Sequence, residues 1–236
     1  MADTREDRSE RVAVRILRAD EMSDRDRHDV FEIFEESYRE ANHEYLQRSI
    51  DRIGLLALAR LGGRPAGFAI SNFRWMDLRG FAEPQLVVLH GMRCVVPGLR
   101  HRGLFGRLNQ AVMEQVSRDV EASGRSARRQ LHCGRWGHAS RAGGRDDPSS
   151  VPRAGTVPGE WQQQVGLAVA EAYGSRLDPE TFVCIGWGTP IGYPNEEFEA
   201  TEAELKAFAP VNRDRGDNLL VISWTPDPPP GWVQTA

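Results

Sequence analysis

One segment of the sequence combines a β-branched strand, a basic turn that contains glycine, and the start of an amphipathic helix. It reads Val95-Val96-Pro97-Gly98-Leu99-Arg100-His101-Arg102-Gly103-Leu104-Phe105-Gly106-Arg107-Leu108. The first backbone N–H groups of a helix have no partner within the helix and lie at the positive end of its dipole, so they bind anions. Glycine lets a ligand approach the backbone, and arginine adds positive charge. The segment therefore predicts a phosphate-binding turn.

Two common nucleotide-binding motifs do not fit this turn. A Walker P-loop requires a lysine after its last glycine, and the one lysine of this chain is Lys206. The Gly-x-Gly-x-x-Gly pattern of dinucleotide-binding folds is also absent from the segment. An ordinary strand-to-helix connection with a basic surface stays open as the plain alternative.

The segment resembles the acyl-CoA-binding motif of the GNAT acetyltransferase superfamily. That motif reads Val-x-Pro-x-x-Arg/Gln-x-x-Gly-x-Gly/Ala and is followed by an apolar helix. Val95, Pro97, Arg100 and Gly103 match it in type and spacing. Phe105 departs from it, because the family has Gly or Ala at that place.

The resemblance implies an α/β (α+β) fold class, with a mixed, mostly antiparallel sheet flanked by helices and a V-shaped cleft between its two central strands. The sequence patterns agree with this order of elements up to about residue 120. Alternation and helical spacing predict strands at 12–17, 55–61, 66–75 and 86–96, and helices from Ser23 or Asp24, over 43–53, and from Leu104 with its stripe Leu104, Leu108, Val112 and Val116.

Beyond residue 120 the elements follow from the physics of each segment. Strands are expected at 129–136, 181–187 and 218–224, and helices at 161–173 and 200–208, the latter with a Thr201–Glu204 capping box. The domain prediction is a disordered N-terminus at 1–11, a single GNAT-like acyltransferase domain at 12–225 with a flexible insertion at 137–158, and a Pro-rich tail at 226–236.

Composition bounds the classes of function. The chain has 236 residues, 40% of them hydrophobic, and a formal net charge of −4, which gives no overall case for nucleic-acid binding. It has no run of about 20 apolar residues and no secretory signal, so we expect a cytoplasmic protein with no membrane partner. Three widely spaced cysteines suit reduced thiols. The preference for Arg over Lys indicates a high-GC bacterial genome.

The resemblance also implies the co-substrate, which is acetyl-CoA or another acyl-CoA, with no metal. The residues that correspond to its binding site are Cys94, Val95, Val96, Arg100, Arg102, Gly103, Leu104, Phe105 and Gly106. The implied acceptor is a small-molecule amine, and a homodimer stays open.

Acyl transfer to an amine requires a base for the ammonium proton and an acid for the leaving thiolate. By resemblance, Tyr173 lies on the helix that carries the family's acid, although a tyrosine with a structural hydrogen bond is the plain alternative. His90 lies midway along the central strand, where an imidazole suits a base and substitutes for the Glu that many members carry. Glu160 is a second candidate base or a helix-dipole partner.

Two cysteine and histidine combinations and one arginine in a predicted strand give weaker signals. His132, Cys133 and His138 have the wrong spacing for a structural zinc site, and strand geometry directs the first two to opposite faces. Cys133 has no identifiable base to make it a nucleophile. Arg93 is unusual in a central strand, where a charge must be paired or reach solvent, and it suits an acidic group of a substrate.

The predicted function is an acyl-CoA-dependent N-acyltransferase that transfers the acyl group, in first place acetyl, directly to a small-molecule amine in a ternary complex. Two alternatives stay open. One is a GNAT-like scaffold reused for other chemistry in a biosynthetic pathway, with a carrier-protein thioester or without CoA. The other is a non-catalytic CoA-binding module.

Overall fold

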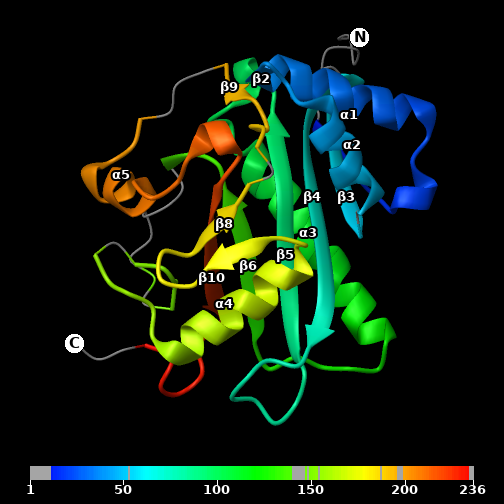
Figure 1. The fold of residues 1–236 in the computed structure, drawn as a ribbon. Coiled ribbons are helices and arrows are strands. Elements are labelled where there is room, and N and C mark those ends of the chain that lie inside the picture. Colours follow the sequence, from blue (N-terminus) through cyan, green and yellow to red (C-terminus); the bar gives the residue numbers. More distant parts are fainter. Residues whose placement is uncertain are drawn as a thin grey trace, which may run out of the picture. The chain divides into compact units, whose positions relative to one another are not determined.

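The structure is a computed structural model that describes residues 12–52, 54–139, 147, 149–153, 155–186, 188–195 and 199–233. The chain forms two compact units. The first comprises Met1–Asn72, Gly91–Ser126 and Gly192–Glu197, and the second comprises Phe73–His90, Ala127–Ile191 and Phe198–Ala236. Strands β4 (Arg64–Met76) and β5 (Gln85–Val95) contribute residues to both units. Figure 1 labels the helices and strands of both units.

The first unit holds the N-terminal elements and the helix that follows the predicted turn. They are β1 (Val12–Leu17), α1 (Asp24–Ser37), β2 (Tyr38–Arg39), α2 (His43–Asp51), β3 (Leu55–Leu61), the 3-10 helix Pro97–Leu99, α3 (Leu104–Ala122) and β9 (Tyr193–Pro194). Ser23 caps α1 through a capping box with Asp26, which confirms the predicted start of that helix. Gly62 and Gly63 make the β3–β4 turn with positive φ angles of 57° and 84°.

The core of the first unit lies between α3 and its strands. β1 pairs antiparallel with β3, and β3 pairs antiparallel with β4. Helix α3 packs against β1 and β3. The predicted stripe on α3 is confirmed, because Leu104, Leu108, Val112 and Val116 are all buried. Burial of these side chains holds the helix in place, and with it the turn that precedes α3.

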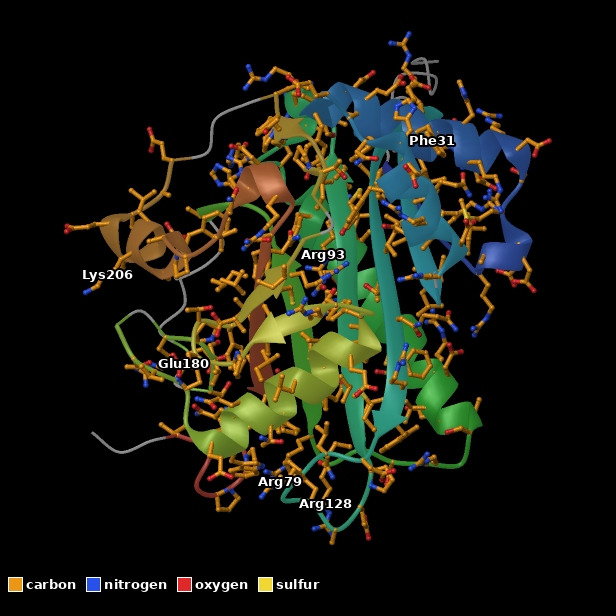
Figure 2. The ribbon with its side chains drawn as sticks, viewed as in Figure 1. Phe31, Arg79, Arg93, Arg128, Glu180 and Lys206 are labelled. Atoms are coloured by element: carbon orange, nitrogen blue, oxygen red, sulfur yellow. The ribbon has the colours of Figure 1, made fainter. Side chains whose placement is uncertain are left out.

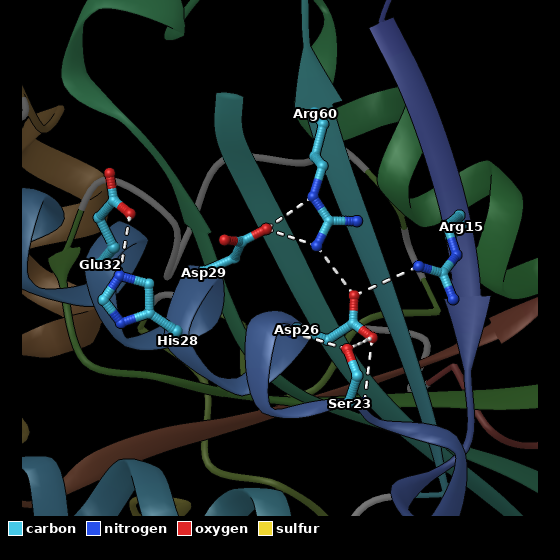
Figure 3. Close-up of polar contacts among 7 residues, drawn as sticks. All are labelled: Arg15, Ser23, Asp26, His28, Asp29, Glu32 and Arg60. Carbon is cyan, nitrogen blue, oxygen red and sulfur yellow. Dashed lines mark hydrogen bonds and ion pairs between the residues drawn. The ribbon is translucent and has the colours of Figure 1, made fainter. Parts of the chain in front are cut away.

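A buried ion network fixes α1 to β3 (Figure 3). The Asp26 carboxylate accepts hydrogen bonds from Arg60 at 2.8 Å, from Arg15 at 3.3 Å and from the Ser23 hydroxyl at 2.7 Å. Asp29 accepts from Nε of Arg60 at 2.6 Å. Burial alone raises the pKa of the Asp26 carboxyl, but the hydrogen bonds from Arg60 and Ser23 outweigh burial and lower that pKa to about 2.

The second unit holds the C-terminal half of the sheet. Its elements are β6 (Gln130–Trp136), α4 (Glu160–Ala172), β7 (Arg176–Asp178), β8 (Val183–Ile185), α5 (Glu202–Phe208) and β10 (Asn218–Thr225). The strands are hydrogen-bonded in the order β1-β3-β4-β5-β6-β10-β8-β7. β5 runs parallel to β6, whereas β10 runs antiparallel to both β6 and β8. The predicted mixed, mostly antiparallel sheet flanked by helices is confirmed.

Residues from the predicted insertion and tail contribute to the second unit. Val151 forms an antiparallel bridge with Ile222 on β10, and the buried Ser149 hydroxyl bonds to the backbone of Trp224. Trp232 is fully buried and donates from its indole to the Ser149 carbonyl. Residues 140–146, 148, 154 and 234–236 lie outside the described residues. The flexible insertion, the tail and the single domain stay predictions, and the disordered segment 1–11 lies outside the described residues too.

Three elements differ from the sequence prediction. The strand expected at 181–187 is shortened to Val183–Ile185, because Phe182 has a φ of +58°, which is incompatible with extended backbone. Strand β7 and the β2–β9 pair were not predicted, since both are only two or three residues long. Within the described ranges, no helix is both long and apolar enough to cross a membrane.

Candidate functional site

The predicted phosphate turn is built as an open backbone nest at the start of α3. Leu99 and Arg100 donate to the carbonyls of Val96 and Pro97, which forms the 3-10 turn after β5. His101 and Gly103 then adopt left-handed conformations with φ angles of 62° and 74°. These two positions reverse the chain and direct it into α3. Gly103 is the N-cap residue of α3, and it has no side chain that could accept a hydrogen bond from the first amides of the helix.

The amide groups of the first turn of α3 have no acceptor inside the helix. The first intrahelical bond is donated by the Arg107 amide to the Gly103 carbonyl at 3.2 Å. The amides of Leu104, Phe105 and Gly106 precede it. No acidic side chain lies in this turn. A 19-residue helix places the positive end of its dipole here, which favours an anion.

The space in front of these amides is open. A Cβ atom built on Gly98, Gly103 or Gly106 would meet no heavy atom within 4 Å among the described residues, and all three glycines are exposed. A pyrophosphate group can therefore approach the backbone at each of these positions. Arg102 and His101, both exposed, add basic side chains at the same turn.

Arg100 has a different place from Arg102. Its Nε donates to the Val95 carbonyl at 3.1 Å, and its Nη2 lies 3.5 Å from the Ser37 carbonyl at the end of α1. The side chain thus links the end of β5 to the end of α1. The Arg of the motif shapes the turn in this chain, besides adding its charge.

The two unusual residues of this region contact each other. The Arg93 guanidinium on β5 lies 5.2 Å from the centre of the Phe105 ring on α3, within the range of a cation–π interaction. Figure 2 marks Arg93 on β5. The Phe105 ring, which replaces the Gly or Ala of the motif, therefore has a local partner that the motif does not require.

Cys94 is a buried thiol behind the turn. Burial raises its pKa, and the nearby Arg100 charge offsets this only in part, so the thiol is protonated at neutral pH. A Cβ on Gly67 would lie 2.8 Å from the Cys94 carbonyl oxygen, so β4 passes this part of β5 at a distance that only glycine permits.

A second cluster lies in the second unit. His90 and His132 are half-buried, with Nε2 of His90 3.1 Å from Nδ1 of His132. The two rings are nearly parallel, at 17° with centroids 5.4 Å apart. One ring must donate the hydrogen of this contact and the other must accept it.

Tyr173, the predicted acid, follows the last residue of α4. Its hydroxyl lies 2.9 Å from the His90 carbonyl and 2.7 Å from the Cys133 carbonyl. A phenol has one proton, so the two carbonyls share it. The Arg135 guanidinium lies over the Tyr173 ring, 4.7 Å from its centre, and donates to Ser175. The tyrosine bridges β5 and β6 where their ladder ends, at the pair His90–Gly134.

The remaining candidates lie away from this cluster or are inert. Glu160 is an exposed surface residue whose carboxylate lies 3.7 Å from Arg79. Cys133 is fully buried, and burial raises its pKa well above the usual value, so it is no nucleophile. The predicted V-shaped cleft requires β5 and β6 to diverge after the last pair of their ladder, His90–Gly134. The cleft stays a prediction.

Sequence reasoning missed the partner of His90. His132 was considered only as a metal ligand, because a contact between strands is not visible from spacing along one strand. Its strand, expected at 129–136, is β6, which pairs parallel with the His90 strand β5. The available signal was alternation, since both histidines occupy strand positions that a parallel register can bring to one face.

Comparison with known proteins gives matches at the level of structure. No model of a known protein family matches the sequence, and no curated protein does. Among solved structures, the chain is similar to an aminoglycoside acetyltransferase from an uncultured soil metagenomic sample in complex with sisomicin, at 12% identity over 46% of this chain and 71% of that chain, with a TM-score of 0.33.

Two further structures were determined with acetyl-CoA. One is a GNAT family acetyltransferase from Brucella melitensis, at 19% identity over 51% of this chain and 75% of that chain, with a TM-score of 0.34. The other is a mutant AtaT toxin bound to the C-terminus of the antitoxin AtaR, at 14% identity over 54% and 76%, with a TM-score of 0.37. These solved structures include acetyltransferases, one of them of the GNAT family.

Proposed function

We propose that this protein is a GNAT-type N-acyltransferase that uses acetyl-CoA or another acyl-CoA and transfers the acyl group directly to a small-molecule amine. The observation that carries the proposal is the open nest at the start of α3. It combines amides without an acceptor inside the helix, three exposed glycines with open space before them, and basic side chains, in a segment that resembles the acyl-CoA motif. In this proposal the pyrophosphate of CoA binds the amides of Leu104, Phe105 and Gly106.

The remaining contacts follow the order of the chain. Arg102 adds charge toward the phosphates, and Arg100 holds the turn through Val95 and Ser37. Val95, Val96 and Cys94 lie just before the turn, where the backbone of β5 would support the pantetheine arm and the thioester. The acyl-CoA is a substrate, and it supplies the activated acyl group.

The chemistry then requires two proton movements. His90 accepts a proton from the substrate ammonium, which frees the nitrogen lone pair. The nitrogen attacks the thioester carbonyl, the C–N bond forms and the C–S bond breaks. The thiolate takes up a proton, and the proton on His90 leaves to water. Tyr173 is the proposed acid; its single O–H proton must turn from the carbonyls of His90 and Cys133 toward the sulfur, and the phenolate then takes up the second nitrogen proton.

The engagement of Tyr173 also favours a second candidate, a non-catalytic CoA-binding module. A hydroxyl bonded to the carbonyls of His90 and Cys133 needs no catalytic role to explain its place. This candidate predicts that acetyl-CoA binds while no amine releases the CoA thiol.

Release of the CoA thiol separates the two candidates. Purified protein is given acetyl-CoA with amino sugars, amino acids, polyamines or aryl amines, and free thiol is measured over time. Amine-dependent release that is lost in His90→Ala, with acetyl-CoA binding retained, supports the enzyme. Binding without release for any amine supports the module, and absence of binding contradicts both.

A further inference from the structure

The sequence around the turn before α3 carries positive charge without negative charge. Residues 84–113 include no aspartate or glutamate, and they include four arginines, which are Arg93, Arg100, Arg102 and Arg107. The first acidic residue of α3 is Glu114, more than two helical turns after the start of the helix. The positive end of the helix dipole therefore has positive side chains around it, and a bound anion would offset both.

The four arginines of this stretch fall into two kinds. Arg93 contacts the Phe105 ring, and Arg100 bonds to two backbone carbonyls, so both have places within the first unit. Arg102 and Arg107 are exposed, and within the described part of the chain their guanidinium groups make no hydrogen bond or ion pair. These two side chains are therefore the ones that can turn toward a ligand at the turn.

Helix geometry directs Arg107 toward the turn. Side chains of an α-helix lean toward its N-terminus and cover the residue about four positions earlier. For Arg107 that residue is Gly103, which has no side chain and has open space in front of it. The Arg107 amide bonds to the Gly103 carbonyl, which fixes the spacing of the two residues. The guanidinium can therefore reach an anion held at the amides of Leu104, Phe105 and Gly106.

The charge at the turn exceeds what one phosphate diester can offset. The end of the helix is equivalent to about half a positive charge, and Arg102 and Arg107 add one charge each. A phosphate diester carries a single negative charge, whereas a pyrophosphate diester carries two. Charge complementarity thus favours a ligand with more than one phosphate group.

We propose that Arg107 is a specificity-determining residue that binds a second phosphate group, next to the one held by the helix amides. This inference rests on the proposed function. It adds to that function a selection among thioesters by their phosphate groups. A thioester with at least two phosphates is favoured, and a single-phosphate arm, such as phosphopantetheine attached to a protein, is disfavoured.

Three ligands with the same pantetheine arm separate the phosphate groups. CoA has a pyrophosphate and a ribose 3′-phosphate, dephospho-CoA has the pyrophosphate alone, and phosphopantetheine has one phosphate. Their affinities for the full-length protein are measured by isothermal titration, or by displacement of acetyl-CoA where binding is weak. The wild type should bind CoA more tightly than phosphopantetheine.

Arg107→Gln should weaken the binding of CoA by about tenfold, the effect of losing one charge-assisted hydrogen bond that water partly screens. The affinity for phosphopantetheine should stay as in the wild type. A parallel loss for dephospho-CoA assigns Arg107 to the pyrophosphate, and a loss for CoA alone assigns it to the 3′-phosphate. Arg107→Lys should retain most of the affinity, because it keeps the charge.

Arg64→Gln is the matched control, because Arg64 is another exposed arginine of the first unit, at the start of β4 and away from the turn in sequence. Its three affinities should equal those of the wild type. Thermal denaturation of all variants should give the wild-type Tm, since both arginines are exposed. Weaker binding then reports on the ligand contact and not on folding.

The two possible failures can be told apart. If the wild type binds none of the three ligands, the proposed function fails. If the wild type binds CoA and phosphopantetheine equally well, or if Arg107→Gln weakens all three ligands equally or none of them, the second phosphate site alone is overturned.

Discussion

Arg93 and Phe105 show how two unusual residues can be a single feature. Each by itself departs from expectation, since a charge is costly in a central strand and a large ring replaces a small residue of the motif. Their contact at 5.2 Å gives the charge a partner and fixes the ring at the start of α3. The departure of Phe105 from the acyl-CoA motif is therefore explained by its contact with Arg93, which is distant in sequence and near in space.

Tyr173→Phe tests whether the tyrosine bridges strands, donates a proton, or does both. Removal of the hydroxyl leaves the carbonyls of His90 and Cys133 without that donor. We expect a loss of about 1–3 kcal/mol in the free energy of unfolding, measured by urea denaturation. If Tyr173 is also the acid, kcat falls by about a hundredfold or more while acetyl-CoA binds as before. An unchanged stability would contradict the bridging role.

Asp26→Asn tests the ion network between α1 and β3. The folded pKa of Asp26, about 2, lies below its ordinary value, so its ionised form stabilises the folded state above pH 4. That stability is lost as the pH falls from 4 through 2. The difference between the folded and the ordinary pKa corresponds to about 2 kcal/mol in the free energy of unfolding, which the Asp26→Asn variant lacks at neutral pH.

The measurement is urea denaturation of wild type and Asp26→Asn at pH 7 and at pH 3. The stability gap between the two proteins should narrow at pH 3, because the Asp26 carboxyl is then largely protonated in the unfolded chain while it stays mostly ionised in the folded protein. A gap of the same size at both values would show that Asp26 does not titrate as the network requires.

At the scale of elements, the turn depends on how closely β4 passes β5. Gly67 on β4 leaves no room for a Cβ, which would lie 2.8 Å from the Cys94 carbonyl oxygen and 3.2 Å from the Val95 side chain. Val95 and Val96 lead directly into the turn, and the Val96 amide bonds to the Ala66 carbonyl on β4 at 3.1 Å. The position of the turn is thus set from β4 as well as from α3.

Gly67→Ala should therefore destabilise the protein, by about 1–3 kcal/mol or more, the range for overpacking a well-packed core. Gly98→Ala is the matched control, because a Cβ there meets no described atom within 4 Å. Thermal denaturation should give a clearly lower Tm for Gly67→Ala and an almost unchanged Tm for Gly98→Ala. Equal Tm values for the two variants would mean that β4 and β5 do not approach as closely as described.

At the scale of the whole molecule, the sequence predicts what is local and misses what is distant. The start of α1, the stripe of α3 and the capping box of Thr201 with Glu204 follow from residues a few positions apart, and each is confirmed. The β2–β9 pair is different, since Asn195 bonds to the Glu36 carbonyl across 159 residues. Such a contact leaves no periodic signal, because its two partners are short and far apart in sequence.

The candidate site divides in the same way. The geometry of the turn before α3 could be predicted, because the whole turn lies within one continuous segment that contains its glycines and arginines; phosphate binding stays a proposal. The His90–His132 pair was not predictable, because it depends on the register between two strands. The contact between the Arg100 guanidinium and the Ser37 carbonyl likewise joins residues that are remote in sequence.

Isothermal titration of acetyl-CoA into the wild type and two glycine variants tests whether the turn before α3 binds acetyl-CoA. Gly103→Asp places a carboxylate in the nest, and Gly63→Asp is matched to it, since both glycines are exposed, have positive φ angles of 74° and 84°, and have open space around them. We expect the wild type and Gly63→Asp to bind acetyl-CoA and Gly103→Asp to lose binding. Absence of binding by the wild type, or equal binding by all three proteins, would contradict this expectation.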